Sequence, residues 1–310
     1  MIVRHLDKRH LEEQRRRHLR ASALTMLAMT LLLAAAGWSL AGAQGAAIAL
    51  ATGAVGFALG QGAPELVLRA TGARPVDRWF APELVDIVAE LSRRAGLPGQ
   101  PRLYLVPSRG LQAFAVGGER GAVAVSTGLL QTLTPREVVG VLAHEISHIR
   151  ANDTWFLRLG AVAAGTTRTL CTVGLVAALL IWPFLAGAGG TMPWGALLVL
   201  AAAPMLGDLL WLRLSRVREF DADAAAVELT GDPEGLAGAL RVLSRVRDDF
   251  WEGFGRAGVP WWARVLRTHP LTCERIERLA RMAPARRVPA SEPRAIWIPG
   301  AWPRRGVLRL

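Results

Sequence analysis

The sequence predicts an α-helical integral membrane protein with four transmembrane helices and a separate α+β domain. Of its 310 residues, 52% are hydrophobic, and residues 21–64 and 169–207 contain no Asp, Glu, Lys or Arg. A spanning helix needs about 20 apolar residues, so each stretch can hold two spans joined by a short turn, expected near residues 41–45 and 186–193. The segment between the two stretches combines a helical pattern with short β-rich runs, which indicates a small sheet.

The distribution of charge orients these spans. Of the 37 Lys and Arg residues, 7 lie in residues 1–20, 12 in residues 65–168 and 18 in residues 208–310. Basic residues accumulate on the cytoplasmic side, so both termini and the α+β domain are expected in the cytoplasm. The alternative for the first stretch is a signal peptide cleaved after the small residues 41–43. Its apolar run is longer than the core of a signal peptide, and a second apolar segment follows at once.

The chain is therefore divided into six consecutive parts. They are a basic lead-in (1–20), a first transmembrane hairpin (21–68), the first part of the α+β domain (69–156), a second hairpin (157–212), the second part of the domain (213–282) and a tail rich in Pro and Arg (283–310).

Composition excludes several other classes. The net charge of +12 arises from dispersed arginines that the orientation bias explains, and no basic and aromatic stripe indicates nucleic-acid binding. Attraction to the surface of a lipid bilayer is the better interpretation. Cys171 lies in a predicted span and Cys273 in a cytoplasmic helix, so no disulfide framework is expected.

The α+β domain has a recognisable order of elements. Residues 81–98 have helical spacing, and β-rich runs follow at 102–107, 111–118 and 121–128. The next helix begins with a capping box, since Thr134 can cap the helix and Glu137 follows three residues later.

This last helix carries the motif HEISH. His144 and His148 lie one turn apart on the same face and can bind one metal ion, while Glu145 is placed to take a proton from a water molecule. Hydrolytic zinc takes three protein ligands, and ligation by two histidines and a carboxylate favours one Zn²⁺ per chain. The alternative is a polar stripe on a surface helix, which a third ligand would exclude.

A candidate third ligand lies in residues 215–231. Glu219 and Asp223 lie one helical turn apart, so Glu219 can complete the metal site and Asp223 can accept a hydrogen bond from a liganding histidine. In the alternative interpretation, Glu219 pairs with Arg216 or Arg218 on a solvated face.

Three segments together resemble a known family. HEISHIRANDT (144–154), SRVREFDADAAAVELTG (215–231) and THPLTCERIERL (268–279) are similar to the HtpX-type bacterial heat-shock membrane metalloproteases, kin of the CAAX prenyl proteases. The resemblance implies a gluzincin (zincin-like) catalytic domain in the bacterial inner membrane. It also implies stress-related endoproteolysis of membrane or misfolded proteins at the cytoplasmic face.

The resemblance also implies a substrate-binding edge strand. Gln112, Ala113 and Phe114 stand where the family usually has Asn-Ala-Phe, so only the side chain at position 112 departs from the pattern. Backbone pairing with an extended peptide remains possible there.

The oxyanion formed during hydrolysis needs a second donor besides zinc. His269 is one catalytic candidate because the other histidines lie in the lead-in or the motif, although it could instead only begin a helix before Pro270. Arg275 is another candidate, or it pairs with Glu274 or Asp223. Tyr104, in a predicted strand, is expected to pack.

Three other functions share parts of this pattern. Site-specific processing, as by a CAAX prenyl protease, would use the same catalytic residues. An inert membrane scaffold would be expected to lack Glu145 or a ligand, and a nucleic-acid binder is the weakest alternative. A homo-oligomer is compatible with the sequence.

Overall fold

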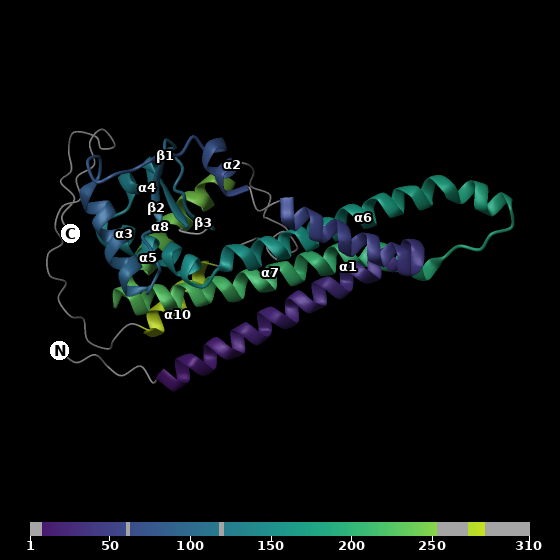
Figure 1. Cartoon of the computed structure of the whole chain (residues 1–310), viewed down its shortest axis with the longest axis horizontal. Coiled ribbons are helices and arrows are strands. Elements are labelled where there is room, and N and C mark those ends of the chain that lie inside the picture. The colour runs from purple at the N-terminus through teal and green to yellow at the C-terminus, as the bar shows by residue number, and fades with distance from the viewer. Residues whose placement is uncertain (1–7, 60–62, 118–120, 253–271, 283–310) are drawn as a thin grey trace. The chain divides into compact units, whose positions relative to one another are not determined.

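A computed structural model describes residues 8–59, 63–117, 121–252 and 272–282 (Figure 1). His269 and the tail 283–310 lie outside the described residues. The chain divides into two compact units. The described parts of the hairpin unit are residues 8–59 and 156–217, and those of the sheet unit are 63–117, 121–155, 218–252 and 272–282.

Three helices are long and apolar enough to cross a membrane, among the residues that the structure describes. Their candidate spanning regions are Leu19–Leu59 within α1 (Lys8–Leu59), α6 (Asp153–Gly187) and α7 (Trp194–Thr230). The large exposed side chains along them are mostly Leu, Ile, Val, Phe and Trp. By length and composition, these helices agree with the prediction of a membrane protein.

Helix α1 is interrupted where the sequence predicts a turn. Ala41 (φ −148°, ψ 33°) and Gly42 (φ 59°, ψ −143°) depart from helical geometry. A Cβ atom added to Gly37 would lie 2.4 Å from the Gly45 carbonyl oxygen and 2.7 Å from Cβ of Ala49. In a continuous helix residues 37 and 49 would be about 18 Å apart, so the second arm of α1 folds back on the first (Figure 1).

Helices α6 and α7 form the second pair of the hairpin unit. Residues 188–193 join them, within the predicted turn at 186–193. These helices and α1 share a small buried apolar cluster. Its members are Cys171 of α6, Leu200 and Ala203 of α7, and Ala36 of α1. Arg168 and Asp208, which flank the charge-free stretch, form an ion pair between α6 and α7.

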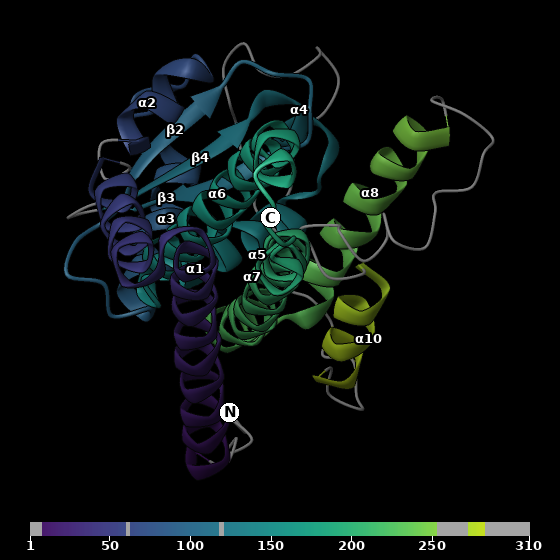
Figure 2. The same ribbon diagram turned by 90° about the vertical axis from the view of Figure 1, so that its right-hand side faces the viewer.

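The sheet unit contains a four-stranded mixed sheet in the order β1-β2-β4-β3. The strands are β1 (Arg74–Pro75), β2 (Arg102–Val106), β3 (Ala113–Val116) and β4 (Ala122–Ser126). β2 and β4 pair in parallel, whereas β3 pairs antiparallel with β4 and forms an edge of the sheet (Figure 2). The strands are shorter than the predicted runs: Pro107 follows β2, Gly117 follows β3, and Thr127 directly after β4 begins α4.

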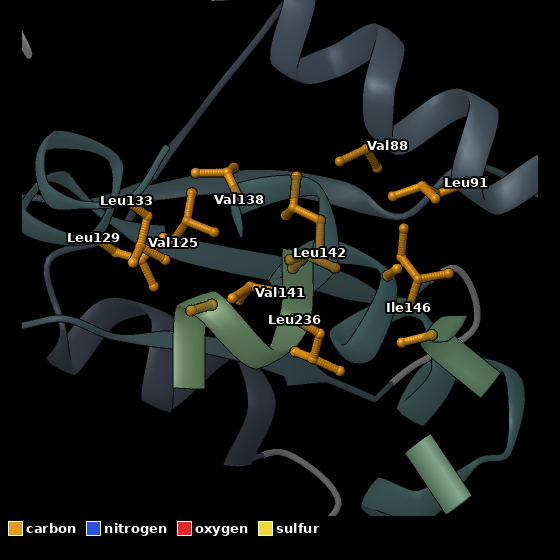
Figure 3. Packing of buried hydrophobic residues seen from close by; sticks show 14 of the residues in the cluster. Val88, Leu91, Val125, Leu129, Leu133, Val138, Val141, Leu142, Ile146 and Leu236 are labelled. Atoms are coloured by element: carbon orange, nitrogen blue, oxygen red, sulfur yellow. The ribbon is translucent and has the colours of Figure 1, made fainter. Parts of the chain in front are cut away.

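The sheet unit also contains helices. The helices are α2 (Ala63–Ala70), α3 (Pro82–Arg94), α4 (Thr127–Thr132), α5 (Pro135–Arg150), α8 (Pro233–Glu252) and α10 (Thr272–Met282). Of these, α5 packs on β3 and β4, α8 packs on α5, and α10 packs on α8. In the main core, Leu142 and Ile146 of α5 pack with Val88 of α3, Val125 of β4 and Leu236 of α8 (Figure 3). Helix α5 is therefore enclosed by apolar contacts from several elements, which makes it a rigid carrier for polar side chains.

Candidate metal centre

Helix α5 is held in place at its start and along its length. Thr134 accepts a hydrogen bond from the Glu137 backbone N–H, and the Glu137 side chain accepts one from the Thr134 backbone N–H, which completes the predicted capping box. Gly140, one turn before His144, lies so close to α8 that an added Cβ would be 2.7 Å from the backbone nitrogen of Leu236. These contacts fix where the second half of α5 presents its polar residues.

Three buried side chains meet beside this half of α5. His144 Nε2 lies 3.2 Å from His148 Nε2 and 3.6 Å from Glu219 Oε2, and His148 Nε2 lies 4.0 Å from Glu219 Oε1. One potential ligand atom from each of the three residues falls within 4.8 Å of the others. The three groups each keep less than a tenth of their surface exposed, so Glu219 does not lie on a solvated face.

His148 is oriented by Asp153, a carboxylate that is not among the predicted site residues. Its Nδ1 lies 2.9 Å from Asp153 Oδ2, and Asp153 Oδ1 lies 3.1 Å from the Arg218 guanidinium. Asp153 and Arg218 are 1% and 3% exposed. The sequence offered one signal for this contact, an acidic residue shortly after the HEISH helix. Only the turn at 151–152, however, brings the Asp153 side chain back to His148.

His144 has a corresponding set of partners. Its Nδ1 lies 3.0 Å from Asp223 Oδ1, on the opposite side of the ring from the three-residue cluster. Arg275 donates two hydrogen bonds to Asp223, at 2.7 and 2.6 Å, and its Nη1 lies 2.8 Å from Glu219 Oε2. Arg275 is thus engaged by two carboxylates, and Glu274 pairs with Arg278 instead.

The charges at this centre suit a divalent cation. Glu145, Asp153, Glu219 and Asp223 contribute four buried carboxylates, against the two buried guanidinium groups of Arg218 and Arg275. Two negative charges remain, which one divalent cation neutralises. Two imidazoles and a carboxylate within reach of one point are also the donors that Zn²⁺ takes in hydrolytic sites.

The same surplus of negative charge raises the pKa of His148. Burial lowers this pKa, but the hydrogen bond to Asp153 and the negative charges of Glu145 and Glu219 outweigh burial and raise it to about 9. A metal ion that bound His148 at neutral pH would therefore displace a proton. Burial also lowers the pKa of Arg275, while Asp223 and Glu219 raise it overall, so the guanidinium stays charged.

The remaining predicted residues fall in defined places. Glu145 is buried on α5 beside His144. Gln112 is exposed just before β3, where its carbonyl accepts a hydrogen bond from the Ser126 backbone N–H, and Ala113 and Phe114 begin the strand. Tyr104 packs with Phe114 against a small apolar cluster on the sheet.

The chain is similar in sequence to known proteins over most of its length. The model of peptidase family M48 matches residues 79–283. A protease HtpX homolog of Paraburkholderia phytofirmans is 34% identical over 286 residues, covering 84% of this chain and 96% of that protein. A protease HtpX homolog of Methylibium petroleiphilum is 32% identical over 300 residues, covering 87% and 99%. The crystal structure of S. mikatae Ste24p aligns with a TM-score of 0.43 at 19% identity, covering 67% of this chain and 50% of that chain.

Together with these matches, the apolar helices and the buried cluster of two histidines and a glutamate identify a membrane-associated metallopeptidase. The chain belongs to peptidase family M48. The predicted HtpX-type resemblance and the prediction of a protease are confirmed.

Removing Arg275 is expected to destabilise the sheet unit strongly. Arg275→Met leaves Asp223 and Glu219 without their shared cation, and an unpaired buried charge costs about 3–5 kcal/mol. In Arg281→Met the same substitution on the same helix removes only an exposed pair with Glu277, worth about 0–1 kcal/mol. Denaturant unfolding of detergent-solubilised protein in the presence of a chelator measures the free energy of unfolding of both variants. Equal losses of stability would contradict the role of Arg275 as the cation shared by Asp223 and Glu219.

Proposed function

We propose that the protein is a membrane-integrated zinc endopeptidase that binds one Zn²⁺ per chain through His144, His148 and Glu219. The observation that carries this proposal is the convergence of these three buried side chains in an M48 chain. Asp223, at 3.0 Å from the outer nitrogen of His144, would fix the tautomer of that ring.

Glu145 would act as the general base. Zinc, when bound, lowers the pKa of water and polarises a peptide carbonyl. Glu145 would accept the proton of the attacking water and return it to the leaving amine. Its position next to a ligand on the same buried helix supports this role. His269 remains our proposed donor to the oxyanion, since Arg275 is held by Glu219 and Asp223.

Substrate would bind as an added strand along β3. This strand lies at an edge of the sheet, paired with β4 on one side. An extended peptide can pair with the backbone of Ala113 and Phe114, and the exposed Gln112 side chain would lie beside it. Backbone pairing is tolerant of sequence, which suits the proposed cleavage of misfolded and membrane proteins in quality control and the stress response.

The proposed topology has four spans in the bacterial inner membrane. The reversal at Ala41 and Gly42 supports counting α1 as two spans, and α6 and α7 supply the other two. A gluzincin-type catalytic domain would then be formed by residues 69–156 and 213–282, with both termini in the cytoplasm. The chain could also assemble as a homo-oligomer.

Replacing the proposed base tests the function. Glu145→Gln is expected to keep about one zinc per chain while casein cleavage falls by about 10²–10⁴-fold, because proton transfer is lost but the ligands remain. Metal analysis and cleavage are measured on detergent-purified wild type and variant side by side. Absence of zinc from both would refute the metal site, and zinc in both with no cleavage by wild type would favour an inert scaffold or a narrow substrate range.

The native cysteines test the topology. Cys273 is exposed on α10, whereas Cys171 is buried among the apolar helices. If the sheet unit is cytoplasmic, a membrane-impermeant maleimide should label Cys273 only after the inner membrane is opened. As a control, Thr191→Cys in a Cys273→Ser background places a thiol in the exposed 188–193 turn and should react in intact spheroplasts. Labelling of Cys273 in intact spheroplasts would show that the sheet unit faces the periplasm and would contradict the proposed orientation.

A further inference from the structure

Asp153 and Arg218 form a second buried pair at the metal centre, separate from Asp223 and Arg275. We propose that Asp153 and Arg218 are positioning residues that hold His148 ready to bind zinc, an inference that rests on the proposed function. They contact the proposed ligand rather than the substrate, so their effect would be on metal affinity and ligand geometry.

The turn after α5 determines where Asp153 lies. Helix α5 ends at Arg150 and is capped by Ala151. Asn152 follows with a φ of 54°, which makes it the one non-glycine residue of positive φ in the described part of the chain. Asn tolerates this left-handed conformation better than most residues. The Asn152 N–H donates to the Ile149 carbonyl, and the reversal carries Asp153 back to His148.

Neighbouring strands hold this turn in place. A Cβ added to Gly117, directly after β3, would lie 2.5 Å from Thr154 Oγ1, and one added to Gly121, before β4, would lie 3.1 Å from Cγ2 of Ile149. The ends of the proposed substrate strand and of its partner therefore lie against both sides of the turn that carries Asp153. Such close contact restricts the positions that the carboxylate can take.

Arg218 supplies the positive charge that stabilises the buried carboxylate of Asp153. A carboxylate that is 1% exposed is costly to maintain without a cation, and the Arg218 Nη1 lies 3.1 Å from its Oδ1. The other carboxylate oxygen is then left to face His148 Nδ1 at 2.9 Å. This fixes the Nδ1-protonated tautomer of the neutral ring and leaves Nε2 free for metal.

The two histidines are thus supported in the same way from different parts of the chain. Each outer nitrogen faces a buried aspartate, and each aspartate faces a buried arginine. Arg218 adjoins the proposed ligand Glu219 on α7, so one short segment would both bind the metal and orient a ligand that another helix supplies.

The test uses the full chain in detergent, carrying a tag without histidine. Asp153→Asn keeps the shape of the side chain and removes its charge, and Arg218→Met removes the cation. Both should weaken zinc binding about 10–100-fold in competition with a chromogenic chelator, as is usual for partners of metal-bound histidines. Both should also shift the visible absorption bands of the cobalt-substituted protein, because the His148 ring is less constrained.

Arg150→Met is the matched control. Arg150 lies two residues after His148 and pairs with Glu228 of α7 at 3.1 Å, but this pair is outside the metal centre. Its zinc affinity and cobalt spectrum should equal those of wild type. Arg218→Lys retains the charge and should recover most of the affinity, and Asp153→Asn still tests the proposal if Arg218→Met fails to fold.

The outcomes separate the two proposals. Weaker zinc binding and shifted cobalt bands in Asp153→Asn, with Arg150→Met unchanged, support the positioning role. Wild-type affinity and spectrum in folded Asp153→Asn, or equal weakening in Arg150→Met, would overturn it while leaving the zinc site intact. A wild-type chain that binds no zinc would overturn the proposed function and this inference together.

Discussion

The structure of the sheet unit depends on keeping four carboxylates buried around one end of helix α5. Burial of an unpaired carboxylate is costly, so each one must face a cation or a hydrogen-bond donor. Arg218 and Arg275 neutralise half of this charge, and His148, with its pKa raised to about 9, responds to the remainder. A divalent cation between His144, His148 and Glu219 would complete the neutralisation, and metal binding and folding of this centre would then be coupled.

The apolar surroundings of α5 are what make this charge cluster useful. Leu142 and Ile146 anchor the helix in the core, while Gly140 lets α8 approach its backbone closely. The polar face can then move little, so donors held 3.2 to 4.0 Å apart are already in place for one ion. A site preorganised in this way avoids ordering its ligands at the moment of binding.

Sequence reasoning predicted the elements with strong local signals and missed those that depend on a chain reversal. The charge-free stretches, the capping box at Thr134 and the i,i+4 histidines all rest on local patterns, and the structure contains spanning helices, that box and a compact His-His-Glu cluster. Asp153 was missed because its contact with His148 depends on the left-handed Asn152, which periodicity does not reveal. The role of Arg275 was left open, since only folding decides which carboxylates a helix on a distant segment meets.

The central claim is that two imidazoles and the carboxylate of Glu219 bind one zinc ion. The most direct test is the zinc K-edge X-ray absorption spectrum of full-length Glu145→Gln loaded with one equivalent of zinc. We predict two imidazole nitrogens at about 2.0–2.1 Å together with oxygen donors and no sulfur. A sulfur shell at about 2.3 Å, or a first shell with a single imidazole, would contradict this assignment.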